Sequence, residues 1–373
     1  MTADPRRLEA VQHHLRRIQA LLPPGEEPRE YLGRLLDQEI SAAGSGSAPM
    51  GVVPVPGAAP IRLLASARTA VEMIHDPARL ADRPEGIVNL GTIEWLLRPA
   101  LPMPGGVPSN MLAGPWQWLP LPELAASARS VCRLDLVLPG YDPLHVGTGF
   151  VAGEDDRGRL LLLTNAHVVN EAVRLGWTLQ KSVRFGCDFE RFLTEAGSIL
   201  LDLDPDYRIH PVYDLAVVHL PRAGLPSPEP RCGPLSVSSA APDPLVGFEL
   251  GVIGHPSFDS RRDLFLSQFG FGDQYGVKRI SPGLLRAVER RNWLGSETEV
   301  FLHDATTLSG SSGSCIVDLR SRRVVGIHFG GWPAVRQGVG LAGDVAAQLF
   351  HANGAVPLWR LAPDPFCAGV AFV

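Results

Sequence analysis

The stretch from Thr307 to Ser314 contains residues whose types and spacing suit nucleophilic chemistry. It runs Thr-Leu-Ser-Gly-Ser-Ser-Gly-Ser, so that glycines stand two positions before and one position after Ser312. A nucleophilic serine needs a tight turn that exposes its hydroxyl and directs backbone N–H groups at the developing oxyanion, and glycines permit such a turn. Taken alone, the same composition also fits a surface loop rich in glycine and serine.

Two upstream segments each place one polar side chain at the end of an apolar, β-branched run. His167 lies within Thr-Asn-Ala-His-Val-Val, and Asp214 begins Asp-Leu-Ala-Val-Val. Taken singly, a buried histidine is usually structural, and an aspartate after a tyrosine usually caps a turn. Together with Ser312 they stand in the order His, Asp, Ser, which is the order of the chymotrypsin-type triad and not of the subtilisin or α/β-hydrolase triads. The set therefore favours a catalytic triad held by strand ends.

Six short motifs make the chain similar to the trypsin-like serine peptidases, in particular to their bacterial glutamyl endopeptidase branch, over about residues 128–350. They are Gly-Thr-Gly-Phe-Val, Thr-Asn-Ala-His-Val-Val, Asp-Leu-Ala-Val, Gly-Val-Ile-Gly-His-Pro, Gly-Ser-Ser-Gly-Ser and Val-Gly-Ile-His-Phe-Gly-Gly, starting at 147, 164, 214, 251, 310 and 325. The last motif is the one that points to the glutamyl branch. Ser311 stands where the family often has Asn, and Cys315 where it often has Pro.

The resemblance implies a role for each residue of the triad. Ser312 attacks the peptide carbonyl, His167 takes its proton and later gives it to the leaving amine, and Asp214 holds the histidine tautomer and stabilises its cation. The oxyanion is expected between the N–H groups of Gly310 and Ser312. The mechanism needs no metal and no organic cofactor. Three other serines are rival nucleophiles that lack this pair of flanking glycines: Ser309, Ser311 and Ser314.

The resemblance also implies a substrate-binding pocket. Thr306 stands where a trypsin-like pocket has Asp, so a preference for Lys or Arg is not expected. Thr307 and His328 match the pocket positions of the glutamyl branch, and Gly330 is assigned to the same pocket. A hydroxyl and an imidazole can bind a carboxylate, which predicts cleavage after Glu or Asp. The alternative for His328 is a strand histidine satisfied in the core.

Composition limits the classes of function. The chain of 373 residues carries a net charge of −5 and has no long basic run, so nucleic acid is not an expected partner. No apolar stretch is long enough to cross a bilayer, and no apolar leader follows the first residues. Five cysteines at scattered spacings suggest neither a disulfide framework nor a metal site. A reduced, cytoplasmic protein is the expectation.

The region before the motifs is predicted to be helical. Apolar residues recur at helical spacing over 4–22 and 27–41, which predicts a hairpin within a module of residues 1–45. This hairpin is either a packing arm or an adaptor for a regulatory protein partner. Residues 46–127 are predicted to be a linker and a Pro-rich connector, with helices over 61–76 and 87–98.

From about residue 128 the pattern changes to short β-rich runs separated by turns. The predicted strands are 130–137, 146–152, 159–164, 199–203, 214–219, 248–254, 263–270, 276–281, 299–303, 314–318, 323–329 and 337–341. About a dozen such strands fit two six-stranded antiparallel β-barrels of the chymotrypsin-like type, a mainly β fold with a helical N-terminal extension. The protease domain would span 128–352, with a helix at 343–352, and a C-terminal extension would span 353–373.

The predicted function is that of a serine endopeptidase acting on a protein or peptide substrate and regulated by its N-terminal region. The main rival is a catalytically silent trypsin-like binding or adaptor protein. Two other rivals are a regulator whose main role is assembly, and an esterase that uses the same triad.

Overall fold

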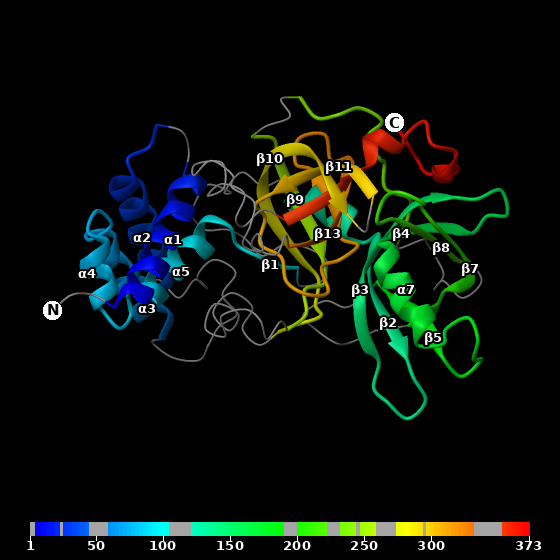
Figure 1. Cartoon of the computed structure of the whole chain (residues 1–373), viewed down its shortest axis with the longest axis horizontal. Helices are drawn as coiled ribbons and strands as arrows, with labels where there is room; N and C mark the ends of the chain where they lie inside the picture. The colour runs from blue at the N-terminus through cyan, green and yellow to red at the C-terminus, as the bar shows by residue number, and fades with distance from the viewer. Residues whose placement is uncertain are drawn as a thin grey trace.

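The computed structural model describes residues 4–22, 25–44, 59–103, 121–189, 200–221, 232–243, 247–258, 274–293, 296–331 and 353–373. The predicted strands 263–270 and 337–341 and the predicted helix 343–352 lie outside these residues. A helical region forms one end of the molecule and two β-sheets form the rest, as Figure 1 shows.

Five helices make up the N-terminal region: α1 (Pro5–Leu21), α2 (Pro28–Gly44), α3 (Ala59–Val71), α4 (Pro77–Asp82) and α5 (Gly86–Leu97). Helix α1 packs against α4 and α5, and α2 packs against α3, which in turn contacts α5. The apolar side chains that face inward form one buried cluster, which includes Val11, Leu36, Leu64 and Ile93. Burial of these faces is what stabilises such short helices.

The helical region is therefore larger than the predicted hairpin. The helices predicted over 4–22, 27–41, 61–76 and 87–98 are all present, but they pack as one bundle that reaches Leu97. Charged contacts join its parts, since Glu94 of α5 lies 2.6 Å from His14 and 3.0 Å from Arg17 of α1. Residue spacing predicted the individual helices but carried no information about which apolar faces meet.

The first sheet in the chain lies beyond helix α6 (Leu121–Ala128). Its strands run in the order β6-β5-β2-β3-β4-β8-β7, all antiparallel where paired, and the described strands form a half-barrel. The bounds are β2 (Val131–Val137), β3 (Leu144–Glu154), β4 (Leu160–Thr164), β5 (Arg184–Asp188), β6 (Leu201–Asp202), β7 (Asp204–Ile209) and β8 (Ala216–Leu220). Helix α7 (Ala166–Arg174) covers it, as Figure 1 shows.

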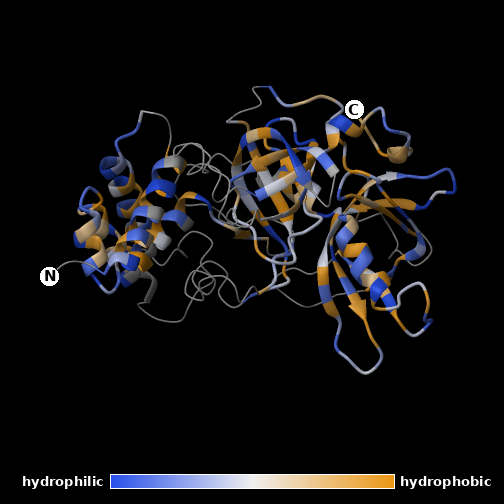
Figure 2. Cartoon of the chain, in the orientation of Figure 1, coloured by the Kyte–Doolittle hydropathy of each residue, from blue (hydrophilic) through white to orange (hydrophobic). Residues whose placement is uncertain are grey.

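The second sheet closes into a barrel. Its order is β1-β10-β11-β14-β13-β12-β9, and β9 also pairs with β10, so six strands form a closed ring with β1 added to it. The bounds are β1 (Leu101–Pro102), β9 (Glu249–Gly254), β10 (Arg279–Trp293), β11 (Ser296–His303), β12 (Cys315–Asp318), β13 (Val324–Gly331) and β14 (Asn353–Pro357). Apolar residues concentrate on the strands of both sheets, as Figure 2 shows. The mainly β, chymotrypsin-like fold class with N-terminal helices is confirmed, although the described strands form one closed six-stranded barrel and one half-barrel in place of the two closed barrels that were predicted.

Several elements were not predicted. Helix α7 is the most important for function, because it begins at Ala166 and so places His167 in a first helical turn and not at a strand end. The strands β1, β5, β7 and β14 and the helices α4 and α6 were also missed, while β10 is much longer than the strand predicted over 276–281. Short elements carry too few residues for periodicity to reveal them.

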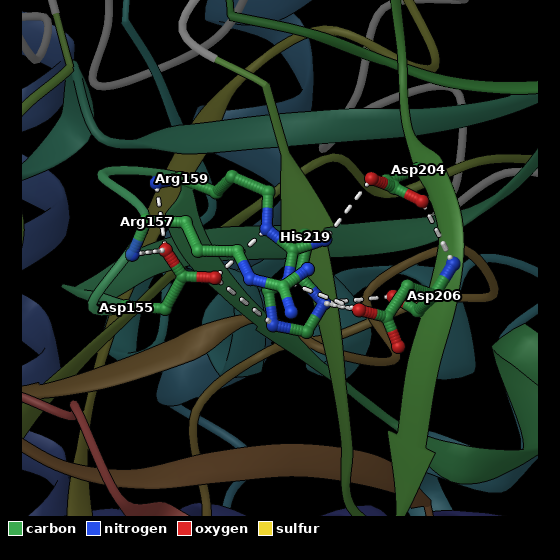
Figure 3. Close-up of polar contacts among 6 residues, drawn as sticks. All are labelled: Asp155, Arg157, Arg159, Asp204, Asp206 and His219. Carbon is green, nitrogen blue, oxygen red and sulfur yellow. Dashed lines mark hydrogen bonds and ion pairs between the residues drawn. The ribbon is translucent and has the colours of Figure 1, made fainter.

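A charged cluster ties the turn before β4 to β7, as Figure 3 shows. The guanidinium of Arg159 donates to Asp155 at 2.8 Å and to Asp204 and Asp206 at 3.0 Å each. These carboxylates raise the pKa of Arg159. Nδ1 of His219 on β8 lies 2.8 Å from the carbonyl oxygen of Asp206. The cluster fixes the outer edge of the sheet that carries Asp214 between β7 and β8.

The C-terminal residues pack on the first sheet after the short helices η2 (Leu358–Leu361) and η3 (Pro365–Cys367). The N–H of Ala371 donates to the carbonyl of Ala152 at 2.7 Å, and the N–H of Val373 donates to the carbonyl of Val237 at 2.9 Å. The chain end is thus inserted between β3 and the segment that connects the sheets. In the described part of the chain, no helix combines the length and apolarity needed to cross a membrane.

Candidate active site

His167 and Asp214 form the most closely joined pair of the predicted site. Oδ2 of Asp214 lies 2.7 Å from Nδ1 of His167, and Oδ1 accepts the backbone N–H of His167 at 3.0 Å. The Asp214 side chain is 1% exposed, whereas that of His167 is 42% exposed. Because an ionised carboxylate only accepts hydrogen bonds, Nδ1 must carry the proton and Nε2 is left as an acceptor.

Local sequence explains this arrangement. Strand β4 ends at Thr164, and Asn165 then opens helix α7, so that His167 stands in the first helical turn. The amide of Asn165 donates to the carbonyl of Asp214 at 2.8 Å. A carboxylate near a helix N-terminus is favourable because the first N–H groups of a helix have no partner within the helix.

Ser312 lies on a tight turn before β12. Gly310 and Gly313 on either side have φ values of +80° and +87°, which side chains other than glycine rarely adopt. A Cβ atom at Gly313 would also lie 1.9 Å from the carbonyl oxygen of Thr148. The two glycines that the sequence singled out are thus required both by the turn and by the close approach of β3.

Thr148 is a residue whose role the sequence analysis missed. Its N–H donates to the carbonyl of Ser312 at 2.8 Å, and its hydroxyl donates to the carbonyl of Gly310 at 2.9 Å. The same hydroxyl accepts the N–H of His255 at 3.0 Å, and its carbonyl accepts the hydroxyl of Thr164 at 2.7 Å. Thr148 therefore joins the two sheets beneath the serine turn. The position of Thr148 in the motif Gly-Thr-Gly-Phe was the sequence signal that could have drawn attention to this residue.

The hydroxyl of Ser312 donates to the carbonyl of Phe329 on β13 at 3.3 Å. Within the described residues, no hydrogen bond joins it to His167, and none uses the N–H of Gly310 or Ser312. Catalytic hydrogen bonds in unliganded sites commonly tighten only when substrate binds.

The predicted pocket residues have different surroundings. The hydroxyl of Thr306 donates to the carbonyl of Arg98 at 2.6 Å, whereas Thr307 is buried. The carbonyl of His328 accepts the N–H of Gly313 at 2.8 Å, which brings His328 beside the serine turn. Gly330 lies at a β-bulge of β13, and nothing stands within 4 Å of where its Cβ would be.

His328 lies in a buried pair of histidines. Its Nδ1 is 3.2 Å from Nε2 of His303 on β11, and the two rings pack edge to face. Burial lowers the pKa of His303 to about 4, and burial together with the nearby His303 and His167 lowers the pKa of His328 well below its usual range. Both rings are therefore neutral near pH 7. The cationic form of His328 considered from the sequence would have to be induced by a bound carboxylate.

The described residues contain no group of three or more His, Cys, Asp or Glu side chains arranged to hold a metal ion. All five cysteines are free and buried: Cys132, Cys187, Cys232, Cys315 and Cys367.

Proteins similar to this chain are serine peptidases. Residues 147–327 match the family model of the trypsin-like peptidase domain. The chain is also 28% identical over 221 residues to Probable serine protease FE772_23060 of Lysobacter enzymogenes. These matches support a trypsin-like serine peptidase. The alignment covers 52% of this chain, and the chain spans 54% of the length of that relative.

Solved structures that are similar to this one include those of two proteases. The Rv3671c protease of M. tuberculosis, in an inactive form, is 20% identical, with a TM-score of 0.40 over 67% of this chain and 93% of that one. Mouse neuropsin, a serine protease, is 14% identical, with a TM-score of 0.41 over 64% and 92% of the two chains. Similarity at this level says nothing about activity.

Proposed function

We propose that this protein is a serine endopeptidase that hydrolyses peptide bonds of a protein substrate with His167, Asp214 and Ser312. The observation that carries the proposal is the double contact of the buried Asp214 carboxylate with Nδ1 and the backbone N–H of His167. This contact leaves Nε2 of a half-exposed imidazole as a base on the side open to substrate.

In the proposed mechanism, Nε2 of His167 removes the proton of Ser312 as its oxygen attacks the scissile carbonyl. The imidazolium that forms is stabilised by Asp214, whose burial strengthens the attraction. The N–H groups of Gly310 and Ser312 donate to the oxyanion. The histidine then gives its proton to the leaving amine, and a water molecule repeats the sequence on the acyl-enzyme.

We further propose a preference for Glu or Asp before the scissile bond. Supporting it, His328 lies beside the serine turn and its Nδ1 is engaged by His303, so its Nε2 can carry a proton toward a substrate carboxylate. An approaching carboxylate favours the cationic imidazole. The buried Thr307 supplies a hydroxyl in the same segment.

The N-terminal helices are proposed to bind a regulatory protein partner. A groove lined by charged residues of α2 and α3 and the segments beside them is the surface that supports this proposal: Glu27, Arg29, Glu30, Arg34, Asp37, Arg68, Glu72 and His75. Charge reversal of Glu30 and Arg34 should leave the helical core intact, because both side chains are exposed. If peptidase activity is regulated in the same way in cells that carry this double variant, the proposal of a partner bound at this groove would be contradicted.

A fluorophosphonate probe tests the triad, because only an activated serine reacts with it. The wild type and Ser309→Ala should label and cleave, while Ser312→Ala should do neither. Ser309 is the matched control, since it is an exposed serine of the same stretch. A wild-type chain that is folded but neither labels nor cleaves would instead be a silent binding protein.

A randomised peptide library, analysed by mass spectrometry, tests the specificity. Cleavage after Glu or Asp that disappears in Ser312→Ala is the expected result. His328→Asn should lower kcat/KM for acidic sites more than for others, with fluorophosphonate labelling retained. Cleavage after unrelated residues would leave the peptidase proposal intact and remove the acidic pocket.

A further inference from the structure

Arg98 lies at the junction between the helical bundle and the closed barrel. It directly follows α5, and its side chain is 4% exposed. Its Nε and Nη2 donate to the two carboxylate oxygens of Asp304 at 2.9 and 3.0 Å, a paired geometry that arginine forms and lysine does not. The following residues are built into the barrel, since Leu101 of β1 pairs with Ile280 of β10.

Asp304 binds two guanidinium groups and one backbone N–H, which come from two segments of the chain. Besides Arg98, it accepts from Arg286 of β10 at 2.5 Å and from the backbone N–H of Leu284 at 2.7 Å. Its own N–H donates to the carbonyl of Leu284 at 3.2 Å. These contacts fix the point at which β11 ends and the segment of residues 304–307 begins.

The backbone of Arg98 holds the next part of that segment. Its carbonyl accepts the hydroxyl of Thr306 at 2.6 Å. Arg98 therefore binds both the first and the third residue after β11, which are Asp304 and Thr306. His303 immediately precedes them and contacts His328. Thr307 immediately follows them. The two residues whose side chains are proposed to bind the substrate carboxylate therefore adjoin residues 304–306: Thr307 follows them, and His328 contacts His303 directly before them.

We propose that Arg98 is a positioning residue for the specificity pocket, through which the helical bundle sets the conformation of residues 304–307. The inference rests on the proposed peptidase function and names the route by which the N-terminal region acts on that site. A displacement of α5 moves Arg98 directly, because the N–H of Arg98 donates to the carbonyl of Glu94 at 3.1 Å within the last helical turn. Glu94 in turn binds His14 and Arg17 of α1.

The test compares full-length wild type, Arg98→Ala, Arg98→Lys and the control Arg184→Ala. Arg184 pairs with Asp202 at 2.7 Å at the edge of the first sheet, so its loss reports the general effect of removing an arginine. Three readouts are taken: the fluorophosphonate labelling rate, kcat and KM on a cleaved peptide, and amide hydrogen exchange at residues 304–308.

Arg98→Ala should lower kcat/KM by about tenfold or more, mainly through KM, because misplacement of binding groups is costly. The labelling rate should stay within about twofold of wild type, since the triad does not depend on the pocket. Exchange at 304–308 should rise. Arg98→Lys should recover part of the loss, and Arg184→Ala should match wild type.

Unchanged kcat/KM or unchanged exchange in Arg98→Ala would overturn the inference. An equal fall in labelling and cleavage would also overturn it, because it would indicate a general loss of structure. If Arg98→Ala does not fold, Arg98→Lys decides by the same criteria. Absence of labelling in the wild type would refute the proposed function alone, and the exchange data would still decide the role of Arg98.

Discussion

The carboxylate of Asp214 holds His167 at two atoms, with Oδ2 at 2.7 Å from Nδ1 and Oδ1 accepting the backbone N–H at 3.0 Å. The two contacts do different things. The backbone contact fixes the start of α7 relative to the loop before β8, and the contact to the ring fixes which nitrogen carries the proton. Orientation and tautomer are therefore set by one buried group.

Asp214→Asn separates these two effects. The amide oxygen still accepts the backbone N–H, so the fold should be retained, but an amide NH₂ facing Nδ1 favours the wrong tautomer. We expect kcat to fall by about 10⁴-fold, as in the general Ser-His-Asp template, with an unchanged unfolding midpoint. Peptide hydrolysis and thermal melting measure this. Asp202→Asn, at an exposed edge strand, is the control, and retention of most activity in Asp214→Asn would contradict the triad.

Thr148→Val should destabilise the junction of the two sheets. Valine preserves the shape but leaves the carbonyl of Gly310 and the N–H of His255 without the hydroxyl that binds both. Leaving buried polar groups unpaired costs about 1–3 kcal/mol, which urea unfolding would detect. Thr148→Ser keeps the hydroxyl and should lose less. Equal stabilities of the two variants would show that the hydroxyl is unimportant.

His210 should position the loop that carries Asp214. Its Nδ1 accepts the N–H groups of Val212 at 3.0 Å and Tyr213 at 2.9 Å, and its Nε2 lies 3.1 Å from Asp364 of the C-terminal segment. An asparagine oxygen can accept the same two N–H groups, but alanine cannot. We expect the fluorophosphonate labelling rate to fall in His210→Ala and to be largely restored in His210→Asn. Identical rates in the two variants would exclude this role.

The buried histidine pair should make stability depend on pH. An unfolded histidine binds a proton near pH 6.5, whereas burial lowers the pKa of His303 to about 4 and that of His328 in the same direction. The free energy of unfolding is therefore highest above about pH 6.5. It decreases as the pH falls toward 4, because over that range the unfolded chain binds protons that the folded chain does not. For His303 the full difference corresponds to roughly 3 kcal/mol.

Urea unfolding between pH 5 and 6.5 isolates this effect, since most carboxylates titrate lower. The free energy of unfolding should decrease with falling pH in the wild type and decrease less in His303→Gln. A flat profile in the wild type would show that the pair is protonated or exposed in solution.

The cysteines should be unreactive in the folded protein. All five are free and buried, and burial raises the pKa of Cys315 and of Cys367 to about 12. Because the thiolate is the reactive form, iodoacetamide at pH 8 should modify none rapidly in the native state and all five in urea. Rapid stoichiometric modification of the native protein, followed by mass spectrometry, would contradict this packing.

The sequence was informative where function and structure are local. The candidates His167, Asp214 and Ser312 stood out because each lies in a short motif whose residue types are constrained by chemistry. The turn at Ser312 was predictable for the same reason, since Gly310 and Gly313 are the residues that tolerate positive φ. Helix periodicity predicted α1, α2, α3 and α5, and β-rich runs predicted most strands near the site.

Contacts between segments that are distant in the chain could not be predicted from the sequence. Arg98 and Asp304 are 206 positions apart, His210 and Asp364 are 154 apart, and Thr148 and His255 are 107 apart. No local pattern marks such pairs, because each depends on how whole elements pack. The same reason explains why the hairpin predicted over 1–45 proved to be part of a larger bundle.

The amino-acid sequence by itself thus determined the fold class, the candidate chemistry and the order of its residues, because periodicity and motif spacing act within a few residues of the chain. Only the tertiary structure decided that His167 opens a helix, that Thr148 joins the sheets, that His328 is buried against His303, and that Arg98 binds Asp304 and Thr306. Burial and hydrogen-bond partners arise only when elements distant in sequence exclude water together.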